Sequence, residues 1–353
     1  MSGREFAVAG RRIGPGAPVF VVAEAGVNHN GERALARRLV DAAAEAGADA
    51  VKFQTFSTEA LVSRDAPKAN YQREATGEAG SQGEMLARLE LDAGAHREIR
   101  DRCAERGLVF FSTPFDAASA DLLERLGVPC FKLGSGEITN LPFLRHVGAK
   151  GKPVIVSTGM STLDEVAQAV AALREAGEAP LALLHCLSAY PAPAAEMNLR
   201  AMDTLSQRFG CPVGLSDHTS GIEIAVAAVA RGAAIIEKHL TLDKGLPGPD
   251  HRASLDPGEF AALVRATRCV EAALGDGRKR PMPAEADTRR VARKSLVAAR
   301  AITAGQRLAA ADVAIKRPGT GISPADLPRA LGRVVRRDVA PDEVIGWETL
   351  GEP

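Results

Sequence analysis

The sequence predicts an α/β protein, a (β/α)8 TIM barrel followed by a small β-rich domain. Three observations support this prediction: eight short apolar runs recur along the chain, amphipathic segments separate most of them, and polar residues gather where the runs end. Continuous apolar strands that alternate with helices are typical of a parallel sheet covered by helices. Eight such units favour a closed barrel over an open sheet.

The predicted strands are rich in β-branched and aromatic residues. They are residues 19–26, 49–56, 108–115, 130–136, 153–160, 181–188, 211–218 and 233–240. Intervening segments such as ERALARRLVDAAAEAG and LDEVAQAVAALREAG have helical spacing and end in glycine, the expected C-cap residue. No GxGxxG motif follows the first strand, which argues against a dinucleotide-binding sheet.

Changes in composition predict the domain organisation. We expect a barrel domain over residues 1–280, a polar, proline-containing linker over 281–294 and the small β-rich domain over 295–353. Residues 57–95 interrupt the alternation after the second strand, and we interpret them as a lid or a dimer contact. Tyr71 in this insertion is interpreted as a packing or interface residue.

The charge balance excludes several classes of partner. Lys+Arg and Asp+Glu both number 44, so the net charge is zero and no basic field exists to bind a nucleic acid or an anionic membrane. The first residues lack the apolar core of a secretory signal, and no apolar stretch approaches the ~20 residues that cross a bilayer. Five scattered cysteines without a CxxC indicate reduced thiols in the cytoplasm, with Cys186 interpreted as a packing residue.

Polar side chains crowd the carboxyl ends of the predicted strands, where the active sites of TIM barrels are built. They include Glu24, Lys52, Gln54, Ser112, Thr113, Lys132, Ser135, Glu137, Ser157, Thr158, Ser188, Tyr190, Ser216, His218, Lys238 and His239. Ammonium and hydroxyl groups that converge there suit a phosphate or a carboxylate. An alternative is that Lys52 and Lys132 form structural ion pairs with Glu24 and Glu137 inside the barrel.

Two histidines end neighbouring strands, His218 in VGLSDHTSG and His239 in AAIIEKHLTLD. With Glu24 they offer a mixed nitrogen and oxygen donor set that suits a divalent ion such as Mn²⁺, Co²⁺, Fe²⁺ or Zn²⁺. The residues equally allow two buried histidines with ordinary hydrogen bonds. An anion pocket beside a metal indicates a phosphorylated substrate and a Lewis acid that acts on a carbonyl group.

A series of sequence blocks resembles the sialic acid synthase family. In chain order, the blocks are AEAGVNHNG, AVKFQTF, STPFD, FKLGSGEITNLP, STGM, LHCLSAYPAP, NLRAM, GLSDHTSG, IEKHLTLDK, GPDH and KRPGTGISP. The resemblance covers nearly the whole chain, and its last part is similar to the family's antifreeze-like (SAF) domain. The first blocks are more similar to bacterial N-acetylneuraminate and N,N′-diacetyllegionaminate synthases than to the pseudaminate branch.

The resemblance implies a transferase that condenses phosphoenolpyruvate with an N-acetylated amino sugar. The implied reaction joins phosphoenolpyruvate, open-chain N-acetylmannosamine and water to give N-acetylneuraminate and phosphate. The alternative within the family is N,N′-diacetyllegionaminate synthesis from 2,4-diacetamido-2,4,6-trideoxymannose. The resemblance also implies a divalent metal, Mn²⁺ or Mg²⁺, and a domain-swapped homodimer.

Position by position, the resemblance also implies the site residues. The catalytic residues would be Glu24, Glu137, His218 and His239, and the metal ligands would be His218 and His239. Phosphoenolpyruvate would contact Lys52, Thr113, Lys132, Ser135, Ser157, Ser188 and Ser216. The sugar would contact Gln54, Glu137, Tyr190, Asp250 and Arg317.

Two other function classes stay open from the residues alone. A metal-dependent aldolase that uses pyruvate would leave the two strand-end lysines without an anion to bind. A sugar-binding or ice-binding module would place all activity in residues 285–353, whose charged KRPG loop and lack of a flat threonine repeat argue against ice binding.

Overall fold

The chain folds into two units. The computed structural model describes residues 5–77 and 79–352. Contacts between residues divide the chain between Gly275 and Asp276. The residues predicted to form a linker, 281–294, contain the short helices η4 (Pro283–Glu285) and α12 (Ala286–Ala292), neither of which buries a residue.

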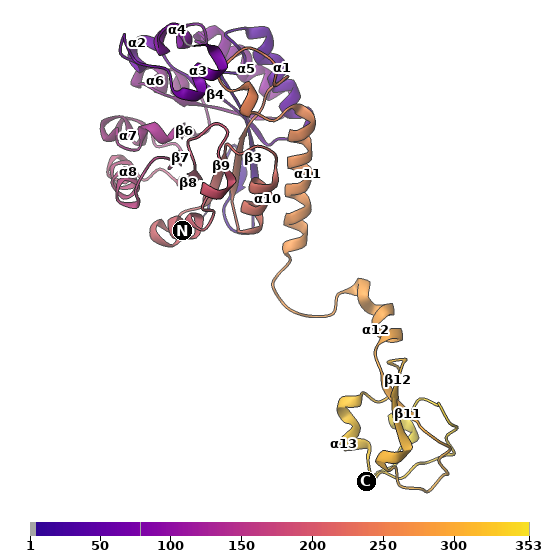
Figure 1. Cartoon of the computed structure of the whole chain (residues 1–353). Coiled ribbons are helices and arrows are strands. Elements are labelled where there is room, and N and C mark those ends of the chain that lie inside the picture. Colours follow the sequence, from indigo (N-terminus) through magenta and orange to yellow (C-terminus); the bar gives the residue numbers. More distant parts are fainter. Residues whose placement is uncertain (1–4, 78, 353) are drawn as a thin grey trace. The chain divides into compact units, whose positions relative to one another are not determined.

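The first unit is built around eight parallel strands, which confirms the predicted fold class (Figure 1). The strands are β3 (Phe20–Gly26), β4 (Ala50–Thr55), β5 (Val109–Pro114), β6 (Phe131–Leu133), β7 (Val154–Ser157), β8 (Leu181–Cys186), β9 (Val213–Asp217) and β10 (Ile235–His239). Their hydrogen-bonded order is β5-β4-β3-β10-β9-β8-β7-β6. The end strands β5 and β6 contact each other, so the sheet curves into a near-closed barrel.

Helices follow the strands and cover the outside of the sheet, as the alternating pattern predicts. They are α1 (Arg33–Glu45), α5 (Ala93–Glu105), α6 (Ala117–Arg125), α7 (Leu141–Gly148), α8 (Leu163–Ala176), α9 (Ala201–Phe209), α10 (Glu223–Ala230) and α11 (Pro257–Leu274). Several begin at side-chain caps; for example, Thr162 and Glu165 form a capping box at the start of α8. No helix in the described part of the chain is both long and apolar enough to span a bilayer.

Two features of the first unit lie outside the strand–helix alternation. The insertion between β4 and β5 carries the short helices α2 (Thr58–Leu61), α3 (Asn70–Thr76) and α4 (Gln82–Ala87). A hairpin of β1 (Phe6–Val8) and β2 (Arg11–Ile13), which sequence patterns did not predict, precedes the barrel. Val8 and Ile13 in this hairpin are fully buried against Phe20 and Phe111, so the hairpin closes the amino-terminal end of the barrel.

Strands β9 and β10 are joined by an ion pair on the side of the sheet that faces the helices. Lys238 Nζ lies 2.6 Å from Asp217 Oδ2 and donates to the carbonyl oxygen of Thr219 at 2.7 Å. Both charged side chains are almost completely buried. The strands approach so closely that a Cβ at Gly214 would lie 2.2 Å from the carbonyl oxygen of Ile235.

The second unit is small and mostly irregular. Strands β11 (Ser295–Ala298) and β12 (Val313–Lys316) form an antiparallel pair, and isolated bridges extend this sheet. The short helices η5 (Ala310–Asp312), η6 (Pro324–Asp326), α13 (Leu327–Ala330) and η7 (Trp347–Thr349) complete it. Its core consists of aliphatic residues that include Leu296, Ile302 and Val335.

We predict that Lys238→Met destabilises the barrel by about 3 kcal/mol or more, because it leaves the buried Asp217 carboxylate without its cation. Urea unfolding of the full chain would measure this loss. Lys244→Met is the matched control, since Lys244 pairs with Glu259 while both side chains are 40% exposed, and such pairs contribute ~1 kcal/mol or less. Equal effects of the two substitutions would contradict the structural role of the buried pair.

Asp312 provides a pH-dependent prediction for the second unit. Its buried carboxylate accepts hydrogen bonds from Ala309 N, Arg300 Nε and Gln306 Nε2, and the Ala309 amide followed by the arginine holds its pKa below the usual value. A lowered folded pKa stabilises the protein above the unfolded pKa of about 3.9, and this contribution disappears as the pH falls through the folded pKa.

Accordingly, Asp312→Asn should speed amide hydrogen exchange in β11 at pH 7 by an amount that corresponds to about 1–2 kcal/mol. The difference from wild type should shrink toward pH 3. Asp287→Asn, which alters an 80%-exposed carboxylate in the same unit, is the control and should have little effect. A difference that does not depend on pH would show that the carboxylate charge is unimportant.

Candidate active site at the carboxyl end of the barrel

Most predicted site residues line one cavity at the carboxyl ends of the strands, with a volume of about 460 Å³. Those that line it are Glu24, Lys52, Gln54, Thr113, Lys132, Ser135, Ser157, Ser188, Tyr190, Ser216, His218 and His239. The period-two alternation of a strand explains how β10 contributes, since Glu237 and His239 line the cavity while Lys238 faces the helices. The same alternation directs Ser216 and His218 to the cavity and Asp217 away from it.

The two strand-end histidines lie next to each other. Their ring centroids are 5.4 Å apart and the rings are inclined at 60°. His218 Nδ1 lies 2.8 Å from the carbonyl oxygen of Leu187, which only accepts, so this nitrogen carries a proton and a neutral ring would have its lone pair on Nε2. Burial lowers the pKa of His218, but the contacts with Cys186 and the Leu187 carbonyl outweigh burial and raise it. His239 Nδ1 is buried without a hydrogen-bond partner, and Asp250 Oδ2 lies 4.0 Å from it.

Tyr190 packs against both histidines. Its ring centroid is 4.1 Å from that of His218 and 5.9 Å from that of His239, where the contact is edge-on. Burial lowers the pKa of His239 well below its ordinary value, and the neighbouring His218 lowers it further, so this ring is neutral. A neutral, buried imidazole with an unused nitrogen is the form that binds a metal ion.

Four buried charges form the floor of the cavity. Lys52 Nζ lies 2.5 Å from Glu24 Oε2 and 3.9 Å from Glu237 Oε1. Lys132 Nζ lies 3.5 Å from the same oxygen of Glu237, which also accepts a hydrogen bond from Ser216 Oγ at 3.1 Å. Two ammonium groups and two carboxylates therefore share a space from which solvent is almost excluded.

Burial and pairing shift the pKa values of this cluster in opposite directions. Burial raises the pKa of Glu24 to about 7, even though Lys52 acts to lower it. Burial would also raise the pKa of Glu237, but Lys132 and Lys52 outweigh that effect and the pKa falls. Burial lowers the pKa of Lys132, whereas the carboxylates Glu237 and Glu24 overcome burial at Lys52 and raise its pKa.

Hydroxyl groups surround the two lysines. Lys52 Nζ donates to Thr113 Oγ1 at 2.9 Å, and Lys132 Nζ donates to Ser157 Oγ at 2.8 Å. The amide of Gly159 donates to Ser135 Oγ at 2.9 Å. A Cβ at Gly159 would lie 2.3 Å from Ser188 Oγ and 2.9 Å from Ser135 Oγ, so only glycine lets these hydroxyls converge. Such a cluster of ammonium, hydroxyl and amide donors suits an anion.

Two predicted site residues of the first unit, Glu137 and Asp250, do not line this cavity. Glu137 lies in η1 (Ser135–Glu137), where its carboxylate accepts a hydrogen bond from Asn140 Nδ2 at 2.8 Å and burial raises its pKa. Asp250 is buried with Oδ2 4.0 Å from His239 Nδ1, and burial raises its pKa to about 6. Arg317 belongs to the second unit, beyond β12.

The structure also places residues at the cavity that the sequence interpretation missed. Glu237 was overlooked, although it lies two residues before His239 in one strand and must therefore face the same side. Tyr71 lines the cavity instead of serving only as a packing or interface residue, and Gln72 beside it does the same. Cys186 also lines the cavity, with Sγ 3.9 Å from His218 Nδ1.

The alternative of structural lysine–glutamate pairs is only partly correct. Lys52 does pair with Glu24, but the partner of Lys132 is Glu237 and not Glu137. Because these pairs line the cavity, they do not exclude a role in binding.

Comparisons with known proteins identify the family. Residues 39–279 match the NeuB family and residues 293–351 match the SAF domain. The chain is 45% identical to N,N′-diacetyllegionaminic acid synthase of Campylobacter jejuni over 92% of this chain and 98% of the relative. It is 44% identical to the enzyme of the same name from Legionella pneumophila, over 94% of each chain.

Relatives that make N-acetylneuraminate derivatives are less similar. N-acetylneuraminate-9-phosphate synthase of Homo sapiens is 37% identical over 97% of this chain and 95% of the relative. A crystal structure of N-acetylneuraminic acid synthetase from Leptospira borgpetersenii superposes with a TM-score of 0.71 at 36% identity, over 80% of this chain and 94% of that one.

These similarities favour the legionaminate alternative over the N-acetylneuraminate reaction that the sequence analysis placed first. They confirm the family that the sequence blocks indicated. The chain belongs to the NeuB family, and it is a phosphoenolpyruvate-dependent nonulosonate synthase with a C-terminal SAF domain.

Proposed function

We propose that this enzyme condenses phosphoenolpyruvate with open-chain 2,4-diacetamido-2,4,6-trideoxymannose and water to give N,N′-diacetyllegionaminate and phosphate. The observation that carries this choice is the 45% and 44% identity to two N,N′-diacetyllegionaminic acid synthases over nearly the whole chain. The cavity supports the same class of chemistry, since it combines an anion cradle with two adjacent imidazoles.

The anion cradle takes phosphoenolpyruvate. Lys52 and Lys132 neutralise its phosphate and carboxylate, and the surrounding hydroxyls of Thr113, Ser135, Ser157, Ser188 and Ser216 donate hydrogen bonds. Glu24 and Glu237 hold both ammonium groups in place before the substrate arrives. Preorganised donors of this kind bind an anion without a reorganisation cost at the moment of reaction.

The histidine pair fits a divalent metal ion such as Mn²⁺ or Mg²⁺. His239 presents a buried nitrogen without a partner, and the hydrogen bond at His218 Nδ1 leaves Nε2 as the nitrogen that a metal would bind once the ring is neutral. Within residues 5–77 and 79–352, no third histidine, cysteine or carboxylate completes a cluster that would hold an ion, so solvent or substrate must supply the remaining ligands. When bound, such an ion supplies Lewis-acid polarisation of the sugar aldehyde.

The reaction requires this chain to align two substrates and to move protons. C3 of phosphoenolpyruvate attacks C1 of the aldehyde, whose oxygen becomes a hydroxyl group after it takes up a proton. Water adds at C2 and loses a proton, and the resulting tetrahedral centre expels phosphate to give the 2-keto acid. Glu24 lines the cavity beside Lys52 and handles the proton, a role for which Glu137 is less well placed because it lies outside the cavity.

The first test is phosphate release from phosphoenolpyruvate with each of the two candidate sugars in the presence of Mn²⁺. We expect kcat/KM for 2,4-diacetamido-2,4,6-trideoxymannose to exceed that for N-acetylmannosamine by roughly 100-fold, because a site built for an acetamido group leaves buried polar groups unpaired with the other sugar. Pyruvate should not replace phosphoenolpyruvate. A preference for N-acetylmannosamine would reject the legionaminate assignment.

A second test concerns the metal. His239→Ala should weaken Mn²⁺ binding, measured by calorimetry, by roughly tenfold or more, because it removes one of two protein ligands. His146→Ala is the matched control, since this histidine is partly exposed and pairs with Asp121 instead. Unchanged Mn²⁺ affinity in the His239 variant would exclude the histidine pair as the metal site.

Two further features of the family resemblance remain predictions for this chain. They are a cytoplasmic, domain-swapped homodimer and a contact between Arg317 and the N-acyl group of the sugar. Sedimentation would measure the oligomeric state, and Arg317→Ala should raise KM for the sugar while leaving KM for phosphoenolpyruvate unchanged.

A further inference from the structure

Helix α3 of the insertion supplies part of the wall of the reaction cavity. Tyr71 and Gln72, its second and third residues, line the cavity together with side chains from the barrel strands. Gln72 is buried and Tyr71 is partly buried. The barrel provides the reacting groups, whereas this wall comes from a segment that interrupts the strand–helix alternation.

Four aromatic rings form a series of contacts that leads away from the histidine pair. His218 lies next to His239, Tyr190 packs against His218 with the rings tilted, and Tyr71 stacks on Tyr190 with ring centroids 4.8 Å apart. Tyr71 is therefore one ring further from the histidine pair than Tyr190. Groups of a sugar that contact Tyr71 must be remote from the aldehyde carbon that reacts beside the histidines.

The polar atoms of this wall are oriented by contacts within the insertion. Gln72 Oε1 accepts hydrogen bonds from Ala69 N at 2.9 Å and from Gln82 Nε2 at 3.2 Å, and Gln72 Nε2 donates to Tyr71 Oη at 3.4 Å. Within the described chain, this amide is the one hydrogen-bond partner of the Tyr71 hydroxyl, and it is a donor. The proton of the hydroxyl is therefore left for an acceptor in the cavity, and burial raises the tyrosine pKa so that the proton is retained.

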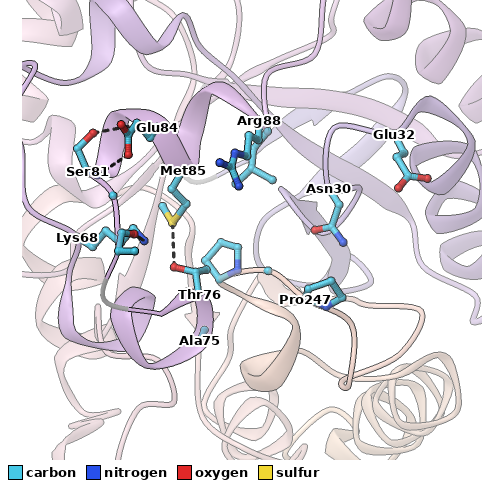
Figure 2. Close-up of a pocket in the computed structure, with 15 residues that line it drawn as sticks. Asn30, Glu32, Lys68, Ala75, Thr76, Ser81, Glu84, Met85, Arg88 and Pro247 are labelled. Atoms are coloured by element: carbon cyan, nitrogen blue, oxygen red, sulfur yellow. Dashed lines mark hydrogen bonds between the residues drawn. The ribbon is translucent and has the colours of Figure 1, made fainter.

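The ends of α3 are held by hydrogen bonds to the residues that follow it. Lys68 Nζ, just before the helix, donates to the carbonyl oxygens of Gly77 and Ala79 at 3.1 and 2.6 Å. Thr76 Oγ1 contacts Met85 Sδ at 3.8 Å and so connects α3 to α4 (Figure 2). These contacts fix the position of the wall without using any barrel strand.

A second cavity, of about 630 Å³, is lined by the carboxyl-terminal turn of α3. Ala75 and Thr76 line it, together with residues of α4 and of the loop that contains Pro247 (Figure 2). Helix α3 thus lines two cavities with successive turns: Tyr71 and Gln72 line the reaction cavity, and Ala75 and Thr76 line the second one.

We propose that Tyr71 and Gln72 are specificity-determining residues that recognise the end of the amino sugar remote from C1. The Tyr71 hydroxyl donates to the carbonyl oxygen of the 4-acetamido group, and its ring covers the adjacent methyl groups. Gln72 orients Tyr71. This inference rests on the proposed function, because substituents at C4 and C6 are the ones that distinguish the legionaminate precursor from N-acetylmannosamine.

The test compares Tyr71→Phe and Gln72→Leu with wild type in the full-length enzyme. The probes are 2,4-diacetamido-2,4,6-trideoxymannose and an analogue with a hydroxyl in place of the 4-acetamido group. For each sugar, either kcat/KM or the competitive inhibition constant is measured. Tyr71→Phe should lower kcat/KM for the diacetamido sugar by roughly three- to tenfold, because one hydrogen bond is lost. The constant for the analogue, and KM for phosphoenolpyruvate, should change less than about twofold.

Glu74→Gln is the matched control, because Glu74 is an exposed residue of the same helix and should leave all constants unchanged. Equal losses with both sugars, or a raised KM for phosphoenolpyruvate, would assign Tyr71 a merely structural role and overturn the inference. The inference would also be overturned if both variants had the same kinetic constants as the wild-type enzyme. Failure of the wild-type enzyme to use the diacetamido sugar would instead reject the proposed function itself.

Discussion

The site depends on four charges buried together inside the barrel: Glu24, Lys52, Lys132 and Glu237. An isolated buried ammonium or carboxylate costs several kcal/mol, and each of these groups is retained because oppositely charged neighbours lie within 4 Å. Packed hydrocarbon would stabilise a barrel equally well, so stability alone does not account for the cluster. Under the proposed function an anionic substrate binds at this cluster, and that role explains why the charges are kept.

The alternation of strands β9 and β10 separates chemistry from structure within a few residues. Side chains on one face of these strands, Ser216, Glu237 and His239, line the cavity. Those on the other face, Asp217 and Lys238, form a buried ion pair that joins the two strands. Because side chains on the two faces alternate, the Asp217–Lys238 ion pair that sets the distance between the strands also sets the distance between the histidines. The histidines themselves do not have to join the strands.

The scaffold and the insertion contribute different properties to the enzyme. Strand ends hold the ammonium, hydroxyl and imidazole groups in a rigid frame, and such a frame suits chemistry that every family member performs. The ends of helix α3 are held by hydrogen bonds within its own segment. Because loops tolerate change better than the elements they connect, a wall built from an insertion can be altered without altering the barrel, and this suits a choice between related sugars.

The sequence by itself determined the eight strands, the helices between them and most of the residues that line the cavity. The spacing of apolar residues and the local composition are properties of short segments. A strand that is buried on both faces must consist of apolar residues, so its own sequence reveals it. The ordered sequence blocks determined the family, and the placement of His218 and His239 at strand ends predicted their meeting.

Only the tertiary structure decided the partner of Lys132, the inward position of Tyr71 and the role of the amino-terminal hairpin as a cover. Each of these depends on a contact between segments that are far apart along the chain or that follow no regular period. Lys132 and Glu237 come from different strands, and Tyr71 lies in an insertion whose path no pattern fixes. Such contacts are set by how the whole fold fills space, and a single sequence does not encode them locally.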